Sequence, residues 1–485
     1  MSRIWTCAYP ALFGVAYILL SFASFPTPTT DLVRPVAIAV LATPLLVVAV
    51  ALVVRGLARA ALVVSALIVG LSAPFLLVAV SAAALVVIGA QVGRGRWLFA
   101  DLRRTSAATA SRAAGVFALA FAAVGIGVAA PSIAGGWFPI ADPGPAGVES
   151  DKPNVYLLLL DGYPRTDTLA SVYGYDNAGF EDGLRELGFE VARGSRSNYP
   201  HTWLTLTTML NGAYLEEIDG LGSAPELAVE QYRRLMSALN GAAMLDLLRE
   251  AGYEIDAIPS PFRSVALSTA DRYLDSGQIT AFEYSLLMHS QLAPLIVRLT
   301  PDFLMSQQRD RFRATLDRLE VEAAGDGAHP KFLFSHLFSP PHAPLVYGRD
   351  GEHLRLPDCV PTTCALWEFP DDAWDRLPDQ IHYTNGEVLE AVARIVRDDP
   401  VGIVILMSDH GSRRDRSDLD EFFHIFFAAR TPGGRLFPGD VSPVNVLRLL
   451  VSTQTDHELA PLPYRAWVFA DETRPLDLTA IEPSP

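Results

Sequence analysis

The stretch that decides the fold is Val401-Gly402-Ile403-Val404-Ile405-Leu406-Met407, followed at once by Ser408-Asp409-His410-Gly411. A short apolar run rich in β-branched residues predicts a buried strand. Two side chains that ligate metals follow it, at the sheet edge where open α/β folds carry their active sites. Asp409 and His410 are adjacent, yet at a strand-to-loop exit both can reach one ion. The segment therefore predicts half of a metal site, whose other half lies elsewhere in the chain.

A second apolar run, Val155–Leu160, ends in Asp161-Gly162. This pattern predicts a buried parallel strand with a carboxylate at its carboxyl tip. An aspartate in this place also starts turns and caps helices. The segment alone leaves both roles of Asp161 open.

The stretch Ser197–Gly212 predicts a turn at Pro200 and then a short helix with Thr202 at its amino terminus. A threonine there can simply cap the helix. Backbone N–H groups and the helix dipole at the same place also favour an alkoxide and a bound phosphate or sulfate. Contact with a metal would lower the pKa of the hydroxyl further. Both roles of Thr202 stay open at this point.

A third strand is predicted in the stretch that begins at Lys331; it ends in His336, and His342 lies in a proline-restricted loop six residues on. The chain has only ten histidines, so two at one strand end indicate a site, although a structural role stays possible for each. A helix predicted over Thr384–Asp398 precedes the strand at 401–407. Repeated strand-helix-strand units predict an α/β domain with a mainly parallel sheet.

The first 137 residues are dominated by apolar side chains, and a membrane-spanning helix needs about 20 of them. Five spans are predicted, because Pro74 divides the long apolar stretch 60–90 into two helices. They cover residues 10–25, 33–54, 56–73, 74–90 and 113–133. They contain essentially no charged side chains, which indicates an anchor and gives no sign of an ion path.

Arginine placement orients this bundle. With five spans, Arg3, Arg55, Arg59 and the five arginines of residues 94–112 share one side, and only Arg34 lies opposite. The positive-inside rule makes the arginine-rich side cytoplasmic. We therefore expect an anchor over residues 1–135, a Gly/Pro-rich linker over 136–150, and an extracytoplasmic domain over 151–485, in the periplasm or at the cell surface.

The net charge changes sign at the boundary between the linker and the expected extracytoplasmic domain. Residues 1–150 carry nine arginines and four acids, a net +5, which leaves −21 for residues 151–485 out of the total of −16. An acidic domain without a polybasic patch argues against nucleic acid as a partner. Outside the cytoplasm, Cys359 and Cys364 could close a small disulfide loop, whereas Cys7 lies in the first apolar segment as a small hydrophobic residue.

In this order, the four segments resemble the alkaline phosphatase/sulfatase superfamily over nearly the whole of residues 151–485. The chain is most similar to membrane-anchored sulfatase-like proteins, the group of lipoteichoic acid synthases and phosphoethanolamine transferases, which also carry five amino-terminal spans. Further shared phrases are Tyr173–Asn177, Ser197–Thr202, Pro341–Pro344 and Val441–Arg448.

The resemblance implies one divalent metal held by Asp161, Thr202, Asp409 and His410. Sulfatases place their nucleophile ten residues before the glycine that ends the motif, and Gly212 lies ten residues after Thr202. His336 and His342 match histidines that contact the transferred group or the leaving oxygen. Asn198 and His424 are weaker candidates for substrate contact.

The chain departs from its relatives in three ways. Thr202–Leu206 lacks the Cys/Ser-x-Pro-x-Arg pattern of true sulfatases, and Asp161 stands where phosphotransferase relatives usually have glutamate. No Asp-x-x-x-His pair for a second metal is evident, so one ion is expected. Oxygen ligands with one imidazole suit Mn²⁺ or Zn²⁺, with Mg²⁺ or Ca²⁺ as alternatives.

The sequence-based hypothesis is therefore an enzyme. We expect metal-dependent transfer of a phosphoryl-type group from a phosphodiester to a glycan or lipid of the cell envelope, through a covalent threonine intermediate. Two alternatives stay open: a sulfatase-like hydrolase of sulfate or phosphate esters, and a non-catalytic protein of envelope-polymer assembly. Membrane lipids are expected partners, and the sequence does not indicate an oligomeric state.

Overall fold

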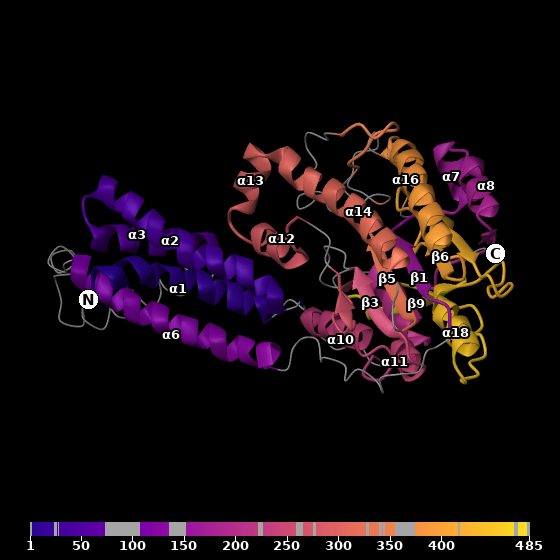
Figure 1. Cartoon of the computed structure of the whole chain (residues 1–485), viewed down its shortest axis with the longest axis horizontal. Coiled ribbons are helices and arrows are strands. Elements are labelled where there is room, and N and C mark those ends of the chain that lie inside the picture. Colours follow the sequence, from indigo (N-terminus) through magenta and orange to yellow (C-terminus); the bar gives the residue numbers. More distant parts are fainter. Residues whose placement is uncertain are drawn as a thin grey trace. The chain divides into compact units, whose positions relative to one another are not determined.

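Two units make up the structure of the chain, a computed structural model (Figure 1). The first comprises residues 1–139 and 282–299, and the second comprises residues 140–281 and 300–485. The structure describes residues 2–23, 27, 29–72, 107–134, 152–221, 227–258, 265–274, 278–325, 329–338, 342, 345–354, 374–415, 418–469 and 474–482. The predicted Cys359–Cys364 disulfide lies outside these residues.

The first unit is helical. Its elements are α1 (Arg3–Phe22), η1 (Thr29–Leu32), α2 (Val33–Val54), α3 (Leu57–Ser72), α6 (Ala107–Ala134), α12 (Ala281–Met288) and α13 (Ala293–Leu299). In the described part of the chain, three stretches are long and apolar enough to cross a membrane: Arg3–Phe22, Thr29–Val54 and Thr109–Ala130. Many apolar side chains of α2 are exposed, among them Leu41, Leu45 and Leu52. Such exposure is typical of a surface that faces lipid.

The predicted count of five spans is corrected by this structure, since the described residues hold three candidate spans. The helix predicted over 56–73 forms as α3, but its 16 residues rise only about 24 Å, less than the roughly 30 Å of a hydrocarbon core. The span predicted over 74–90 lies outside the described residues.

Glycines let α1 and α6 approach closely. A Cβ on Gly115 would lie 3.0 Å from Trp5 Nε1, and one on Gly125 would lie 3.2 Å from Ala16 Cα. Small residues at such contacts are characteristic of packing between membrane helices. Because residue 115 meets residue 5 and residue 125 meets residue 16, the two helices run parallel and begin at the same end of the unit.

The short helices α12 and α13 belong to this unit although they come from the middle of the chain. The rings of Phe282 and Phe22 pack edge to face with centroids 5.8 Å apart, and Arg34 pairs with Glu283. The Gln291 amide donates to the Leu71 carbonyl at 2.7 Å. The ends of α1 and α3 and the start of α2 therefore lie at one end of the unit. The sequence pattern of residues 281–299 gave no sign of this packing.

The second unit is built on a seven-stranded sheet. Its strands are β1 (Val155–Leu160), β2 (Glu190–Val191), β3 (Glu254–Ile258), β4 (Arg272–Tyr273), β5 (Lys331–Leu337), β6 (Ile403–Met407) and β7 (Phe427–Arg430). They lie in the order β2-β7-β6-β1-β5-β3-β4, and β6, β1, β5, β3 and β4 are parallel to one another. Strands β7 and β2 run antiparallel. The predicted mainly parallel sheet is confirmed.

Helices cover both faces of this sheet (Figure 1). On one face, Leu158 and Leu160 join a core with residues of α7 (Thr166–Tyr173), α8 (Ala178–Glu186), α14 (Pro301–Ala324) and α16 (Leu377–Asp398). On the other face, Leu157 and Leu159 join residues of α9 (Thr202–Asn211), α11 (Ala243–Glu250) and α18 (Pro443–Gln454). Because β1 is buried on both faces, its unbroken apolar run is explained.

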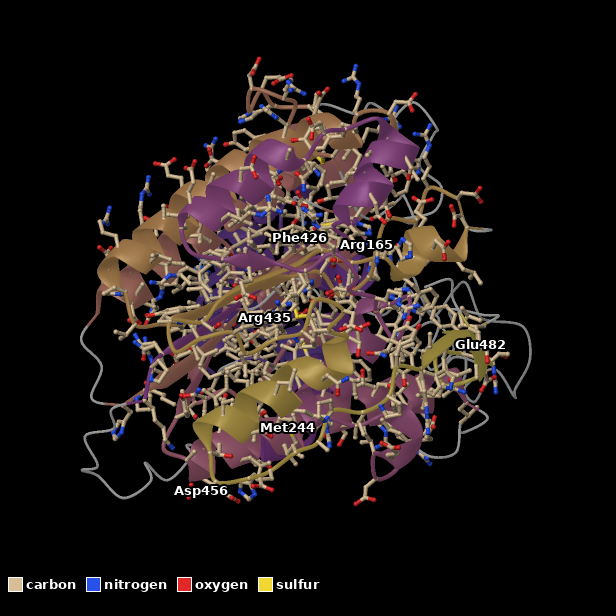
Figure 2. All side chains as sticks on the ribbon, turned by 90° about the vertical axis from the view of Figure 1, so that its right-hand side faces the viewer. Arg165, Met244, Phe426, Arg435, Asp456 and Glu482 are labelled. Atoms are coloured by element: carbon tan, nitrogen blue, oxygen red, sulfur yellow. The ribbon has the colours of Figure 1, made fainter. Side chains whose placement is uncertain are left out.

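The remaining elements extend the periphery. They are η2 (Leu215–Glu217), α10 (Ala228–Asn240), α17 (Leu419–Phe423) and the hairpin of β8 (Ala466–Phe469) and β9 (Leu478–Ile481). Figure 2 shows the dense interior around Phe426, which is 1% exposed, and Asp456 at the rim. Full burial of such a side chain contributes roughly 1.5–3 kcal/mol.

Candidate functional site

The predicted segments meet at the carboxyl edge of the sheet because β1 pairs with both β5 and β6. Leu159 of β1 lies beside His336 of β5 and beside Met407 of β6. Asp161 and Asp409, each two residues further along its own strand, therefore leave the sheet side by side. This register supplies the acid, the Asp-His pair and the first histidine of the site.

Gly162 lets these groups approach one another. Its backbone has φ +62°, and its amide donates to Asp409 Oδ1 at 3.1 Å. A Cβ at this position would lie 2.3 Å from the His342 ring. Position 162 therefore requires glycine, because the turn is left-handed and the His342 ring lies in close contact.

Thr202 is the first residue of α9, and its hydroxyl does not cap the helix. The N-cap residue is His201, in an extended conformation with φ −149° and no side-chain capping bond. Thr202 Oγ1 lies 3.4 Å from His410 Nε2. Ser197 Oγ donates to the Asp409 carbonyl at 2.6 Å, which ties this segment to the fourth one.

The hydrogen bonds of His410 fix its tautomer. Nδ1 lies 2.7 Å from the Gly411 carbonyl, which can only accept, and Nε2 lies 2.8 Å from Arg413 Nη2, which can only donate. Nδ1 therefore carries the proton, and Nε2 presents a lone pair. Histidine ligands of metals use this arrangement, in which one nitrogen donates to a carbonyl and the other binds the ion.

Three oxygen atoms surround the same His410 nitrogen. Asp161 Oδ1 lies 3.3 Å from Nε2, Asp409 Oδ2 lies 3.4 Å from it, and Thr202 Oγ1 lies 3.4 Å from it. Two ligands of a tetrahedral ion, each about 2.1 Å from the metal, are about 3.4 Å apart. Two carboxylates facing an imidazole lone pair repel one another without a cation. These residues therefore fit a divalent metal.

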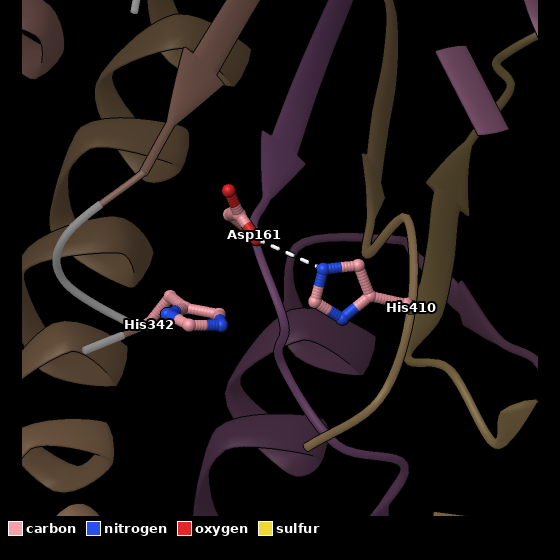
Figure 3. A group of neighbouring side chains, drawn as sticks. All are labelled: Asp161, His342 and His410. Carbon is pink, nitrogen blue, oxygen red and sulfur yellow. Dashed lines mark ion pairs between the residues drawn. The ribbon is translucent and has the colours of Figure 1, made fainter. Parts of the chain in front are cut away.

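Asp409 Oδ2 gives independent support. Asp409 is fully buried, and its Oδ2 atom accepts no hydrogen bond from the described residues. A buried carboxylate oxygen without a donor is costly unless a charge compensates it. Asp161, His410 and His342 also present ligand atoms that all lie within 4.8 Å of one another (Figure 3). His342 thus approaches the predicted ligand set.

His336 supports Asp161 from the neighbouring strand. Its Nε2 lies 3.0 Å from Asp161 Oδ2. Burial by itself would raise the pKa of Asp161, but the hydrogen bond from His336 and the nearby His410 and His342 rings outweigh it. They hold the pKa of Asp161 well below its usual range. Asp161 is therefore a carboxylate at neutral pH, as a metal ligand has to be.

The site encloses a cavity of about 40 Å³, lined by Asp161, Thr202, His336, His342, His410 and also by His201, Trp203, Val265, Phe338 and Arg413. About 10–15 Å³ of such space holds one water molecule, so the cavity has room for about three. A larger hollow of about 360 Å³ lies beside β2 and β7. No histidine is among the described residues that line it, so we place the chemistry at the smaller cavity.

Two further residues that line the cavity, His201 and Arg413, were not predicted from the sequence. His201 stacks on Trp203 with ring centroids 3.8 Å apart, and burial, followed by the charge of Arg413, holds the pKa of His201 well below its usual range. The available signals were a histidine directly before Thr202 and an arginine two residues after Asp-His-Gly. His201 lies within the shared stretch Ser197–Thr202, where no role was predicted for it, and Arg413 lies beyond the segment Ser408–Gly411.

Asn198 and His424 lie elsewhere. Asn198 Nδ2 donates to the Arg465 carbonyl at 2.8 Å, and its Oδ1 accepts from the Val444 amide at 3.2 Å. His424 Nδ1 lies 3.0 Å from Arg165 Nη2. Burial and the Arg165 charge lower the pKa of His424. The structure therefore gives both side chains structural contacts outside the cavity.

No protein-family model matches the sequence, and a comparison with curated proteins finds no match. Among solved structures, the chain is similar to the C-terminal periplasmic domain of EcEptC from Escherichia coli, with 15% identity, a TM-score of 0.44, and coverage of 68% of this chain and 93% of that one. The soluble domain of lipooligosaccharide phosphoethanolamine transferase A from Neisseria meningitidis is 11% identical (TM-score 0.40, coverage 64% and 90%). The phosphonate monoester hydrolase of Agrobacterium radiobacter is 13% identical (TM-score 0.40, coverage 66% and 81%). Sulfatases are also among the similar structures.

Proposed function

We propose that this protein is a membrane-anchored enzyme that transfers a phosphoryl-type group from a phosphodiester donor to a glycan or lipid of the cell envelope. The observation that carries the proposal is the convergence of Asp161, Asp409 and Thr202 on the lone pair of His410 Nε2, at 3.3–3.4 Å. A hydroxyl that coordinates a metal ion loses its proton more readily and so becomes a stronger nucleophile. Threonine is not the residue that sulfatases convert to formylglycine, so phosphoryl transfer is favoured.

Asp161, Asp409, His410 and Thr202 would hold the ion, with His342 beside them. A bound divalent cation supplies charge that lowers the pKa of the Thr202 hydroxyl and neutralises the transferred oxygens. Zn²⁺ and Mn²⁺ suit the mixed oxygen and imidazole donors best.

The chain's own residues then perform two displacements. Thr202 Oγ1, whose proton passes to solvent, attacks phosphorus; the new O–P bond forms as the bond to the leaving alkoxide breaks, and the alkoxide takes a proton from protonated His342 or His336. In the second half, the acceptor hydroxyl attacks the phosphothreonine and loses its proton to the same imidazole. The Thr202 oxygen is released, and the histidine is reset.

The size of the cavity supports a small reacting group. About 40 Å³ beside the ligands admits the transferred group and excludes the body of a lipid or glycan. The bodies of the donor and acceptor would remain outside it, and Trp203, Val265 and Phe338 make part of its lining apolar.

The arrangement of the helical unit supports the proposals that the substrate is linked to lipid and that the second unit lies outside the cytoplasm. Ser72 lies at the Phe22 end of the unit, because Leu71 contacts Gln291 there, whereas α6 begins at the Trp5 end. Because α6 runs parallel to α1, its last residues lie at the Phe22 end. With the arginine-rich end inside, the second unit is extracytoplasmic.

The test is substitution of Thr202 in the full-length protein. Thr202→Ala is expected to abolish metal-dependent cleavage of a phosphodiester, a loss of at least about 10³-fold, and Thr202→Ser is expected to retain part of it. Mass spectrometry of wild-type protein quenched during turnover should find the adduct on Thr202. Turnover of Thr202→Ala at the wild-type rate would exclude Thr202 as the nucleophile.

A further inference from the structure

Arg413 is the one cation among the residues that line the site cavity in the described part of the chain. Its Nη2 donates to the Pro200 carbonyl and to His410 Nε2, both at 2.8 Å, and its Nη1 lies 3.4 Å from His201 Nε2. The residue is 5% exposed. Neither the motifs nor the proposed transfer step gives this guanidinium a role.

The loop that carries Arg413 is fixed by hydrogen bonds to Glu421, and these bonds hold Arg413 in its position. Glu421 is 2% exposed and accepts from the Arg414 amide at 2.8 Å, the Asp415 amide at 2.9 Å and the Tyr173 hydroxyl at 3.0 Å. Ser412 also hydrogen-bonds to it. A Cβ on Gly411 would lie 2.0 Å from the Glu421 carbonyl oxygen, so only glycine fits there. The carboxylate thus holds residues 411–415 in one conformation.

The bond from Arg413 to His410 uses the very lone pair that a metal would take. One nitrogen lone pair cannot accept a proton from Arg413 and bind an ion at the same time. The guanidinium therefore has to give up this bond when a metal binds, while the Pro200 carbonyl can keep it beside Thr202. In that position its planar fork matches the oxygens of a phosphate or sulfate group.

His201 completes the pair. It accepts from Arg413 at Nε2, so its proton is on Nδ1, and that buried atom has no hydrogen-bond partner among the described residues. The residue is 4% exposed and lines the same cavity directly before Thr202. A buried donor without an acceptor next to a nucleophile indicates an anionic ligand.

We propose that Arg413 and His201 bind the anionic oxygens of the transferred group, and that Arg413 is held in reserve on His410 Nε2 until a metal displaces it. This inference rests on the proposed function, because it assigns the residues that hold the group Thr202 attacks. Metal and phosphate then bind cooperatively: the ion frees the arginine, and the arginine holds the anion.

The experiment measures binding of Zn²⁺ alone, and of inorganic phosphate with and without Zn²⁺, to the full-length protein by titration calorimetry. Wild type is expected to bind phosphate at least about tenfold more tightly when Zn²⁺ is present. In Arg413→Met, phosphate binding to the Zn²⁺-loaded protein weakens by about tenfold or more, and Zn²⁺ itself binds more tightly because its competitor is gone. Arg413→Lys restores part of the phosphate affinity.

Arg414→Met is the matched control. Arg414 is the next residue, but its side chain pairs with Asp375 at 2.7 Å and lies outside the cavity. The Arg414→Met variant should therefore bind Zn²⁺ and phosphate with the affinities of wild type. His201→Phe keeps an aromatic ring on Trp203, removes the donor, and should weaken phosphate without strengthening Zn²⁺ binding.

Phosphate affinity of Zn²⁺-loaded Arg413→Met equal to that of wild type would overturn the inference, as would a wild type that binds no metal. Arg413→Lys, which keeps the charge, serves as the second test if Arg413→Met fails to fold: wild-type affinities for both ligands in Arg413→Lys would also contradict a specific fork. If the binding results hold but no phosphodiester is cleaved, the proposed function fails and the anion site stands.

Discussion

At the scale of single residues, Asp409 has two oxygen atoms with different surroundings. Oδ1 accepts from the Gly162 amide at 3.1 Å, whereas Oδ2 is buried without a donor in the described chain and lies 3.4 Å from the lone pair of His410. The first oxygen positions the side chain, and the second one is left for a cation. Removing the charge at this residue should therefore have opposite effects with and without metal.

We predict that Asp409→Asn raises the melting temperature of protein kept in a chelator, because an uncompensated buried charge disappears. Added Zn²⁺ at about 100 times its Kd should stabilise wild type by roughly 2.7 kcal/mol and the variant by almost nothing. Thermal unfolding with EDTA and with Zn²⁺ measures both effects. Equal stabilisation of the two proteins by Zn²⁺ would remove Asp409 from the ligand set.

Asp256, which is not among the residues that line the site cavity, allows a prediction about how stability depends on pH. It is fully buried in β3, and its Oδ2 accepts from Arg272 at 3.2 Å. Burial, with the nearby Glu254 and Glu322, raises the pKa of Asp256 to about 7, against the lowering effect of Arg272. The folded state therefore keeps this proton at pH values where the unfolded chain has lost it.

Because the folded state binds more protons, this carboxyl makes folding less stable as pH rises from its usual pKa near 4 to about 7. The loss amounts to about 4 kcal/mol at 1.36 kcal/mol for each pKa unit. Asp256→Asn should not lose stability in this way. As pH rises over that range, the free energy of unfolding of wild type should therefore fall relative to that of the variant. Unfolding curves of both proteins between pH 4.5 and 8 measure it, and parallel curves would contradict it.

At the scale of elements, the loop 411–415 depends on one carboxylate. Glu421 of α17 accepts from two backbone amides of this loop, Arg414 and Asp415. We predict that Glu421→Ala frees the loop, leaves those donors without a buried acceptor at a cost of roughly 1–3 kcal/mol each, and exposes the Arg413–Arg414 bond.

Limited trypsin digestion measures this change, since Arg413 is buried in wild type. Cleavage after Arg413 should be fast in Glu421→Ala and slow in wild type. Asp420→Ala, one residue earlier and on a half-exposed side chain, is the matched control. If the control is cut as fast as Glu421→Ala, the carboxylate does not hold the loop.

The same elements show what sequence patterns can predict. The strands ending at Leu160 and Met407, and the helix from Thr202 to Asn211, are continuous in sequence, so their periodicity and end signals locate them. The site follows, because parallel strands deliver their carboxyl ends to one edge. Arg413 could not be located in this way, since its position depends on a loop wrapped around Glu421, and that contact has no local pattern.

The helices α12 and α13 escaped prediction for a similar reason. Residues 281–299 carry a mixed apolar pattern that is ordinary for a soluble domain, and their partners Phe22, Arg34 and Leu71 lie more than 200 residues away in sequence. The antiparallel β7 and β2 are likewise short, and their pairing is set by tertiary contacts. Such long-range contacts are not encoded in periodicity.

At the scale of the whole molecule, the chain enters the helical unit a second time at residues 282–299. This segment packs at the end of the unit that holds Phe22 and Leu71, whereas Arg55 and Arg59 follow α2 and begin α3. Residue 59 is 12 residues before Leu71 on one helix, which places the two about 18 Å apart along its axis. The two ends of the unit therefore carry different sequence markers.

We predict that these ends lie on opposite sides of the membrane. In a background with Cys7, Cys359 and Cys364 replaced by serine, a membrane-impermeant maleimide added to intact cells should label Arg298→Cys and not Arg59→Cys; both side chains are exposed in the structure. Permeabilised cells should label both, which controls for reactivity. The positive-inside rule predicts this direction, because Arg55 and Arg59 belong to the cytoplasmic side. Labelling of Arg59→Cys alone in intact cells would place residues 282–299 in the cytoplasm, and with them the end of the unit from which we expect the enzyme to reach its lipid donors.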